Sequence, residues 1–206
     1  RHADRAWIRR LFTHPDTESL DDVELSEVVT STLRFLASEL KDQVQVEQAL
    51  TPGLTVRANK NKLIHVLTNL VQNSLDALRR KTFTDERGTI RLESRATADA
   101  VEFLVRDNGP GIAPENLTKI FDPFFTTKDV GEGMGLGLSI CYRLMREFGG
   151  DIKVDSQPGR YCQFTLVFPM RKADASSWHS KRRASRPGRR CPRASCRPRP
   201  ARRSAG

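Results

Sequence analysis

A row of polar side chains along one predicted helix contains the residues best suited to bind a metal ion. The row comprises His65, Asn69, Asn73, Asp76 and Arg80, spaced four, four, three and four residues apart, so they stack on one helix face. The side-chain carbonyl of Asn73 would suit Mg²⁺, which prefers oxygen ligands and takes few of them from protein. The alternative is a solvated helix face, because asparagine is a mediocre helix former that is usually tolerated at surfaces.

A second candidate, the aspartate loop (residues 107–112), directly follows a predicted strand. An ionised Asp107 only accepts hydrogen bonds, and the exocyclic amine of adenine is a matching donor. Gly109 and Gly111 would let a flat ligand approach the backbone closely. A simple Gly-Pro turn between two elements is the alternative interpretation.

The phenylalanine block (residues 121–128) places Phe121, Phe124 and Phe125 within five residues of a loop. Phenylalanines are normally buried in a core. The functional alternative is that they anchor a lid on which Thr127 and Lys128 face phosphate.

The glycine block (residues 131–139) has glycine at every second position from 131 to 137 and continues into a predicted helix. Such glycines expose successive backbone N–H groups at a helix N-terminus, which favours binding of an anionic phosphate. A flexible linker is disfavoured because the glycines lead straight into the helix. Neither the GxxxxGK[ST] pattern nor the GxGxxG pattern of other phosphate loops fits these residues.

Alternating elements must position these groups. Hydrophobic periodicity predicts a helix over residues 22–40 and a long helix over 60–81 with Asn59 as its N-cap. Two short segments around 44–46 and 54–56, separated by Pro52-Gly53, predict a strand pair. Further strands are expected at 89–94, 101–107, 151–155 and 161–168, with a short helical piece at 114–120 and a helix at 136–148.

The net charge of +10 belongs to the C-terminal end of the chain. Residues 171–206 contain 13 Lys and Arg against one acid, which leaves 1–170 near neutrality at −2. A basic arm that binds nucleic acid is therefore a hypothesis about that end alone, and no nucleic-acid partner is expected for the body, which lacks a basic stripe with interleaved aromatics. An Arg/Pro/Ser-rich segment of this kind cannot build a core, so we expect it to be a disordered extension or a non-native sequence.

Cysteine use and hydropathy indicate a cytoplasmic location. Cys141 and Cys162 lie in apolar contexts typical of buried thiols, and Cys191 and Cys196 lack partners at zinc-site spacing. The sequence contains no run of about 18 apolar residues, so no membrane span is predicted. Anchoring of a longer parent protein in the inner membrane stays open.

Together the four blocks resemble, in order and spacing, the N, G1, F and G2 boxes of the sensor histidine kinases, and the resemblance covers roughly residues 20–170. These kinases belong to the wider GHKL superfamily with type II topoisomerases, mismatch-repair ATPases and a heat-shock chaperone. The resemblance implies a two-layer α/β sandwich of the Bergerat type, with a mixed sheet covered on one face by helices. It also implies ATP and Mg²⁺ as ligands.

The resemblance also implies individual roles. Asn73 would bind magnesium, Asp107 would bind adenine, Gly109 and Gly111 would shape the adenine pocket, and Gly133, Gly135 and Gly137 would close on the phosphates. Thr165 is similar, more loosely, to a threonine that supports the adenine site. Asn69 and Lys128 are the catalytic candidates, and the remaining expected nucleotide contacts are Asp76, Ile112, Phe124, Thr127, Met134, Leu136 and Leu138.

Asn69 separates two hypotheses within the superfamily. Hydrolysing members have a glutamate general base at this position, and an amide cannot take up a proton usefully at neutral pH. We therefore expect phosphoryl transfer to a protein histidine, with an ATPase that acts as a conformational switch as the alternative.

The resemblance further implies domains and partners. Residues 1–16 would be the end of a dimerisation and phosphoacceptor region, 17–170 the ATP-binding domain and 171–206 the basic tail. His2, His14, His65 and His179 do not fit the acceptor pattern, so we expect the acceptor histidine upstream, on a dimerisation domain of a homodimeric parent. A response regulator receiver domain would then accept the phosphate.

Overall fold

The computed structural model describes residues 19–84, 87–128 and 134–170. The predicted end of a dimerisation region at 1–16 and the basic tail at 171–206 lie outside the described residues, as do Gly131 and Gly133.

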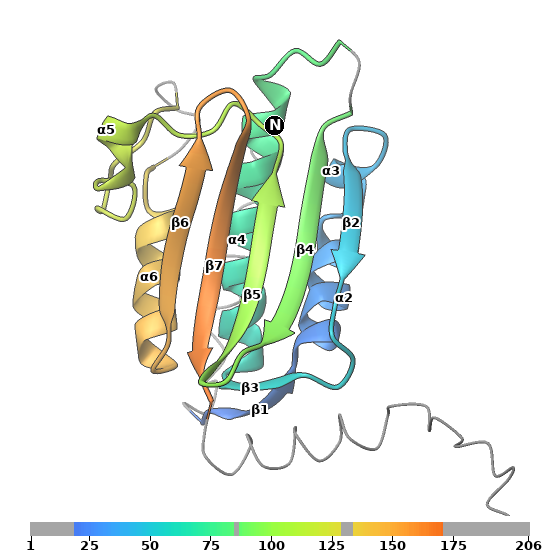
Figure 1. The fold of residues 1–206 in the computed structure, drawn as a ribbon, viewed down its shortest axis with the longest axis vertical. Coiled ribbons are helices and arrows are strands. Elements are labelled where there is room, and N and C mark those ends of the chain that lie inside the picture. The colour runs from blue at the N-terminus through green and yellow to red at the C-terminus, as the bar shows by residue number, and fades with distance from the viewer. Residues whose placement is uncertain (1–18, 85–86, 129–133, 171–206) are drawn as a thin grey trace, which may run out of the picture. The chain divides into compact units, whose positions relative to one another are not determined.

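A five-stranded sheet forms one layer of the fold, and helices form the other. The strand order is β2-β4-β5-β7-β6, in which β2 (Gln45–Ala49) pairs parallel with β4 (Thr89–Ala96). The other neighbours, β5 (Ala100–Asp107), β7 (Tyr161–Pro169) and β6 (Asp151–Gln157), pair antiparallel, so the sheet is mixed. In Figure 1 the helices α2, α4 and α6 all lie on the same side of this sheet. The predicted two-layer α/β sandwich is therefore confirmed.

Helix α4 (Lys60–Arg79) is the central element of the helical layer. It begins where predicted, because the Asn59 side chain accepts a hydrogen bond from the backbone N–H of Lys62 at 3.0 Å. Its fully buried leucines, among them Leu63, Leu70 and Leu75, belong to the core against the sheet. The packing fixes which way the polar row of the same helix faces.

The N-terminal helix predicted over residues 22–40 is wrong in its extent. Residues Asp21–Glu24 form strand β1, and the helix is divided into α2 (Leu25–Phe35) and α3 (Ala37–Leu40) at Leu36. Leu36 itself has φ −89° and ψ 6°, outside regular helix. Apolar periodicity continues through this break because Leu36 itself is buried, like Val28 and Val29 in α2 and Leu40 in α3.

The predicted pairing of the two short strands is also wrong. Strand β3 (Thr55–Ala58) pairs antiparallel with β1 in a separate two-stranded sheet, while β2 joins the main sheet beside β4. The turn at Gly53, with φ +65°, separates the two strands without joining them into a hairpin. Alternation identifies a strand, whereas its partner depends on contacts distant in sequence.

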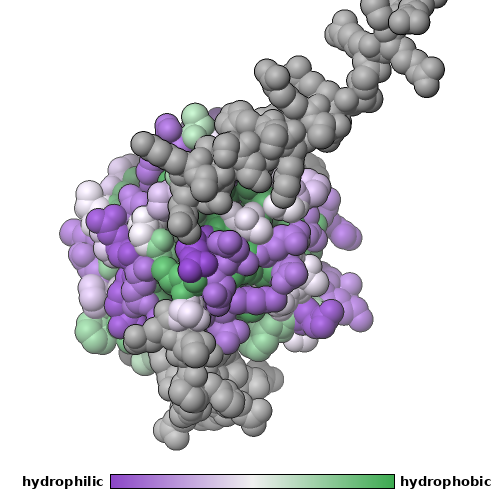
Figure 2. All heavy atoms as spheres, turned by 90° about the horizontal axis from the view of Figure 1, so that it is seen from below, coloured by the Kyte–Doolittle hydropathy of each residue, from purple (hydrophilic) through white to green (hydrophobic). Residues whose placement is uncertain are grey.

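The remaining elements follow the predictions to within a few residues: α5 (Pro114–Leu117), α6 (Gly137–Glu147), and strands β4 to β7 as bounded above. Cys141 and Cys162 are buried free thiols, as expected. Seen from the end at which β1 and β3 lie, the described surface is mainly hydrophilic with smaller apolar areas between (Figure 2). None of the helices in the described ranges is both long and apolar enough to cross a membrane.

Candidate nucleotide site

The middle of the polar row is half-buried, which disfavours a purely solvated helix face. Asn69, Asn73 and Asp76 all have intermediate exposure. Gly137, the first residue of α6, is so close to Asn69 that a Cβ on it would lie 3.6 Å from the Asn69 Oδ1. The Nδ2 atom of Asn69 is buried, lies beside the Cys141 thiol and has no oxygen or nitrogen acceptor in the described part of the chain. The row thus faces the start of α6.

The two ends of the polar row differ from its middle. His65 is half-buried, and burial lowers the pKa of its imidazole. Arg80 is exposed and follows the last residue of α4.

Asp107, the last residue of β5, is the one acidic residue among the buried polar side chains described, at 3% exposure. Its Oδ2 accepts a hydrogen bond from the Ser74 hydroxyl of α4 at 2.8 Å, and its Oδ1 accepts from the Gly109 N–H at 3.0 Å. Burial raises the pKa of the Asp107 carboxyl, and hydrogen bonds from Ser74, Gly109 and the Cys162 backbone partly oppose the rise. A buried carboxylate at the end of a strand is therefore held in place beside α4.

The aspartate loop packs directly on the turn between β6 and β7 (the β6–β7 turn, residues 157–161). Gly111 has φ +70°, and a Cβ there would lie 2.5 Å from the carbonyl oxygen of Gln157. The Ile112 N–H donates to the Ser156 hydroxyl at 2.8 Å. Both the backbone conformation and the close approach require glycine at this position.

The phenylalanine block and the described part of the glycine block meet through their backbones. The N–H of Phe124 donates to the carbonyl of Gly135 at 3.0 Å. Gly135 has φ +65°, and a Cβ would lie 2.5 Å from the carbonyl carbon of Phe124. Two blocks that are separate in the sequence therefore form one unit.

The three phenylalanines of the block do not share one environment. Phe121 packs against the rings of Tyr142 and Phe164, with centroids 5.8 and 6.5 Å apart, and so anchors the segment to α6 and β7. Phe125 is half-buried, whereas Phe124 is 73% exposed and Met134 is 60% exposed. An anchored segment with an exposed apolar rim is consistent with a lid.

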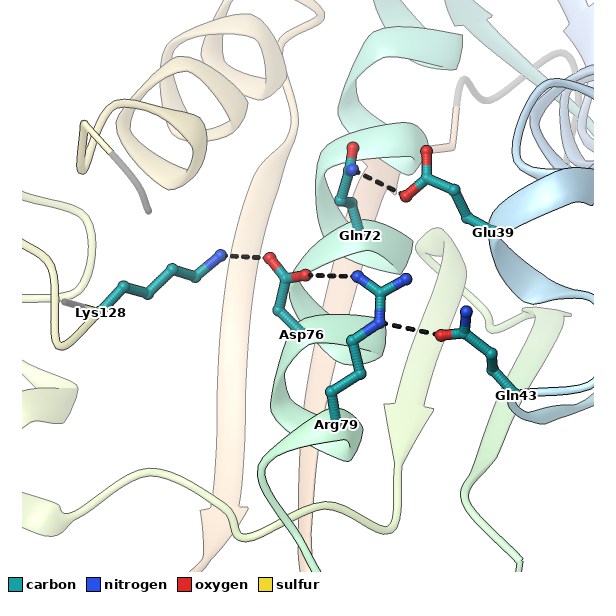
Figure 3. A network of polar contacts seen from close by, with 6 residues as sticks. All are labelled: Glu39, Gln43, Gln72, Asp76, Arg79 and Lys128. Carbon is teal, nitrogen blue, oxygen red and sulfur yellow. Dashed lines mark hydrogen bonds and ion pairs between the residues drawn. The ribbon is translucent and has the colours of Figure 1, made fainter. Parts of the chain in front are cut away.

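Lys128 reaches the polar row. Its ammonium group is ion-paired with Oδ2 of Asp76, whose Oδ1 lies 3.4 Å from Nη1 of Arg79 (Figure 3). Arg79 Nε in turn donates to the Gln43 side chain at 2.8 Å. Asp76 therefore joins the end of the phenylalanine block to α4, and Arg79 joins α4 to the segment after α3. Thr127, the neighbour of Lys128, is exposed.

The N-terminus of α6 lies opposite Asn69. Its N-cap residue, Leu136, has no side chain that could satisfy the first backbone N–H groups, which begin at Gly137 and Leu138. N–H groups that no described side chain caps, together with the positive end of the helix dipole, favour an anion here.

The structure does not bring Thr165 to this cluster. On β7 the side chains of Cys162, Phe164 and Leu166 are buried toward the helices, so Thr165 lies on the opposite face of the sheet. The strand register places Cys162 directly across from Asp107. Strand parity could have identified Cys162 from the sequence, because it alternates with buried aromatic and aliphatic residues, whereas no local signal indicated Ser74.

Comparisons with known proteins agree with this geometry. Residues 58–172, more than half of the chain, match the family described as histidine kinase-, DNA gyrase B-, and HSP90-like ATPases, and the chain belongs to that family. Within it, the chain is of the sensor histidine kinase type. The sensor histidine kinase ZraS of Salmonella typhimurium is 33% identical over 156 residues, covering 74% of this chain and 32% of ZraS. The sensor kinase CckA of Brucella abortus is 34% identical over 179 residues, covering 80% of this chain and 18% of CckA.

Solved structures show the same fold. The catalytic domain of the histidine kinase ThkA superposes with a TM-score of 0.63 at 29% identity, covering 73% of this chain and 95% of that domain. ThkA in complex with the response regulator protein TrrA gives 0.60 at 28% identity, covering 73% of this chain and 41% of that one. The chain thus contains a histidine kinase ATP-binding catalytic domain and spans a third or less of the length of the two sensor kinases named above.

Proposed function

We propose that this chain binds Mg–ATP and supplies the nucleotide half of a histidine kinase active site. A ring nitrogen of a histidine on a separate dimerisation domain would attack the γ-phosphorus while the bond to the β-phosphate oxygen breaks and ADP leaves. The observation that carries the proposal is that the site beside α4 has two ends, one suited to the base and the other to the phosphates of a nucleotide. A buried hydrogen-bond acceptor, Asp107, lies at one end, and the N-terminus of α6 faces Asn69 at the other.

At the adenine end, the Asp107 carboxylate would accept a hydrogen bond from the exocyclic amine of the base. Gly109, Gly111 and Ile112 would form the wall on which the base lies, supported by the β6–β7 turn. Cys162 replaces Thr165 in our assignment, because Cys162 lies opposite Asp107 in the strand register.

At the phosphate end, backbone N–H groups of Gly135, Leu136, Gly137 and Leu138 would donate to phosphate oxygens, with Gly133 extending the same cradle. Lys128 and Thr127 would add a cation and a hydroxyl, and Phe124 and Met134 would form the outer rim of the lid. Phosphoryl transfer needs mainly positioning and charge neutralisation, which such groups provide.

The residues present also fit a magnesium ion that is held mostly by phosphates and water. Asn73 and Asp76 offer oxygen atoms on one helix face, and the described residues include no cluster of three or more His, Cys, Asp or Glu that could form a closed metal site. Bound Mg²⁺ would neutralise phosphate charge, with Asn73 as its protein ligand.

The choice of transfer over hydrolysis depends on Asn69. Its amide is beside the start of α6, where the phosphates would lie, and it cannot act as a general base for water. We therefore assign a histidine as the acceptor and a response regulator receiver domain as the next acceptor. The complex that ThkA forms with the response regulator protein TrrA is consistent with such a partner. A dimerisation domain would make the parent a homodimer.

The test is calorimetric titration of the full chain with Mg–ATP, compared with Asp107→Asn. The variant should bind roughly 10- to 100-fold more weakly, because a charge-assisted hydrogen bond to the base is lost. Asp99→Asn is the matched control: Asp99 is exposed in the turn before β5, at the end of that strand distant from Asp107. Equal affinity of wild type and Asp107→Asn would refute the adenine assignment.

A further inference from the structure

Lys81, just beyond the end of α4, points its ammonium group at three backbone carbonyls. Its Nζ donates to the carbonyl oxygen of Asn108 at 2.7 Å and of Gly159 at 3.1 Å, with a longer contact of 3.4 Å to Gly109. The ring of Phe83 lies on the same cation, 5.2 Å from Nζ to the centroid. A lysine has three N–H donors, and all three here have acceptors from two different segments.

The two segments that Lys81 joins also contact each other. The Gly159 N–H donates to the carbonyl of Pro110 at 2.6 Å, so the β6–β7 turn and the aspartate loop share a backbone hydrogen bond. On its other side the loop is held by Asn108, whose Oδ1 accepts from the Thr89 N–H at 2.7 Å and whose Nδ2 donates to the Arg87 carbonyl at 3.0 Å. Lys81 joins the segment just after α4 to this assembly, beside the hydrogen bond that Ser74 of α4 donates to Asp107.

The position of Lys81 also affects the electrostatics of Asp107. Burial raises the pKa of the Asp107 carboxyl, and the positive charge of Lys81 is among the influences that lower it again. The same cation therefore holds the loop and favours the acceptor form of the carboxylate.

We propose that Lys81 is a positioning residue for the adenine end of the nucleotide site, holding the aspartate loop between α4 and the β6–β7 turn. Lys81 does not touch the nucleotide in this account. It acts through the backbone of Asn108 and Gly109, which follow Asp107 and fix the wall of the adenine pocket. The inference rests on the proposed nucleotide function and adds a residue that neither the four blocks nor the polar row includes.

The variant Lys81→Met keeps the length and apolar contact of the side chain and removes the three donors. It should weaken binding of Mg–ADP and Mg–ATP by about tenfold each, because the two ligands share the base and a charged hydrogen-bonding group is lost at that end. Lys81→Arg should bind within about threefold of wild type, because guanidinium donors can reach the same carbonyls. Lys60→Met is the matched control, since Lys60 is the first residue of α4, at the end of the helix distant from Lys81, and is ion-paired with Glu27.

A second measurement separates positioning from general destabilisation. Hydrogen exchange at the Gly159 and Ile112 amides should accelerate by about tenfold in Lys81→Met, while amides in the middle of α4 keep their protection. Unchanged exchange at both amides, or wild-type affinity for both nucleotides, would overturn the role of Lys81. Failure of the wild-type chain to bind either nucleotide would instead refute the proposed function, so the two failures are distinguishable.

Discussion

The ammonium group of Lys128 is ion-paired with the carboxylate of Asp76, three residues beyond Asn73 on α4. The two residues are 52 positions apart in the sequence, and their contact joins the end of the phenylalanine block to the helix face that we assign to magnesium (Figure 3). The two side chains are 24% and 27% exposed, so the pair keeps some contact with water and contributes on the order of 1 kcal/mol to stability. Its importance therefore lies in where it holds the cation.

Replacing Lys128 with methionine should lower the rate of phosphoryl transfer far more than it lowers stability. Loss of one positioned donor to developing phosphate charge typically reduces such a rate by roughly 100-fold. Single-turnover transfer kinetics with saturating Mg–ATP measure this effect, and thermal unfolding measures stability. Lys119→Met, which removes an exposed lysine nearby in the sequence, should keep the wild-type rate. A wild-type rate for Lys128→Met would remove Lys128 from the catalytic residues.

Two glycines with the same backbone conformation offer a matched test of the lid. Gly135 (φ +65°) lies within 2.5 Å of the Phe124 backbone once a Cβ is added, whereas Gly149 (φ +71°) has nothing within 4 Å. Gly149→Ala should cost about 1 kcal/mol of stability from its left-handed conformation and leave nucleotide affinity unchanged. Gly135→Ala should in addition displace the phenylalanine block and weaken ATP binding by about tenfold. Equal ATP affinities of the two variants would contradict the close packing of the two blocks.

The Asp107 carboxyl should give stability and affinity opposite dependences on pH. Because burial raises its pKa in the folded state, the fold binds the proton more tightly than the unfolded chain does. The stability that this proton binding adds to the fold is complete below the ordinary carboxyl pKa and is lost as pH rises through the raised pKa of Asp107. Adenine binding needs the ionised acceptor, so nucleotide affinity should rise across the same interval.

Asp107→Asn isolates this effect. Asparagine keeps an acceptor for Gly109 and a polar partner for Ser74, so the variant should match or exceed the wild-type stability at neutral pH while binding nucleotide poorly. Urea unfolding from acid to neutral pH provides the comparison. If the unfolding free energy of the wild type rose relative to that of the variant as pH increases, the pKa of Asp107 would be lowered in the folded state instead.

Asn69→Ala should separate function from stability in a similar way. The Nδ2 atom is buried with the Cys141 thiol, a weak acceptor, as its neighbour and makes no stronger hydrogen bond among the described residues, so its removal should change the unfolding free energy by less than about 1 kcal/mol. Asn59→Ala, the same substitution at the N-cap of the same helix, should cost about 1 kcal/mol and leave transfer unaffected. Asn69→Ala should lower the transfer rate by about tenfold or more, and an unaltered rate would contradict its assignment.

Local sequence signals predicted the elements well and their long-range pairing poorly. Asn59 capped the long helix as expected, and strands β4 to β7 appeared within a few residues of their predicted bounds. The partner of β2 was mispredicted because a Pro-Gly turn between two short strands is typical of a hairpin. The actual choice depends on β4, which is distant in the sequence and with which β2 pairs in parallel.

For the proposed site, the sequence predicted groups that belong to contiguous blocks and did not indicate those contributed singly. The Phe124–Gly135 contact joins two predicted blocks, and Gly137 approaches Asn69 as the nucleotide hypothesis requires. Ser74 and Lys81 carry no motif and become visible only when the fold places them beside the aspartate loop, whereas the alternation of β7 could have identified Cys162. Thr165 was proposed from a loose resemblance to a threonine of related proteins, whereas the alternation of β7 directs it to the opposite face.

Phosphoryl transfer between separate proteins tests the central claim most directly. The full chain is mixed with γ-labelled Mg–ATP, with and without a purified histidine-bearing dimerisation domain of a sensor histidine kinase. We predict acid-labile label on the added domain, no stable label on this chain, and negligible phosphate release when the acceptor is omitted. Sustained phosphate release without an acceptor, or acid-labile label on any of the chain's own four histidines, would contradict the account.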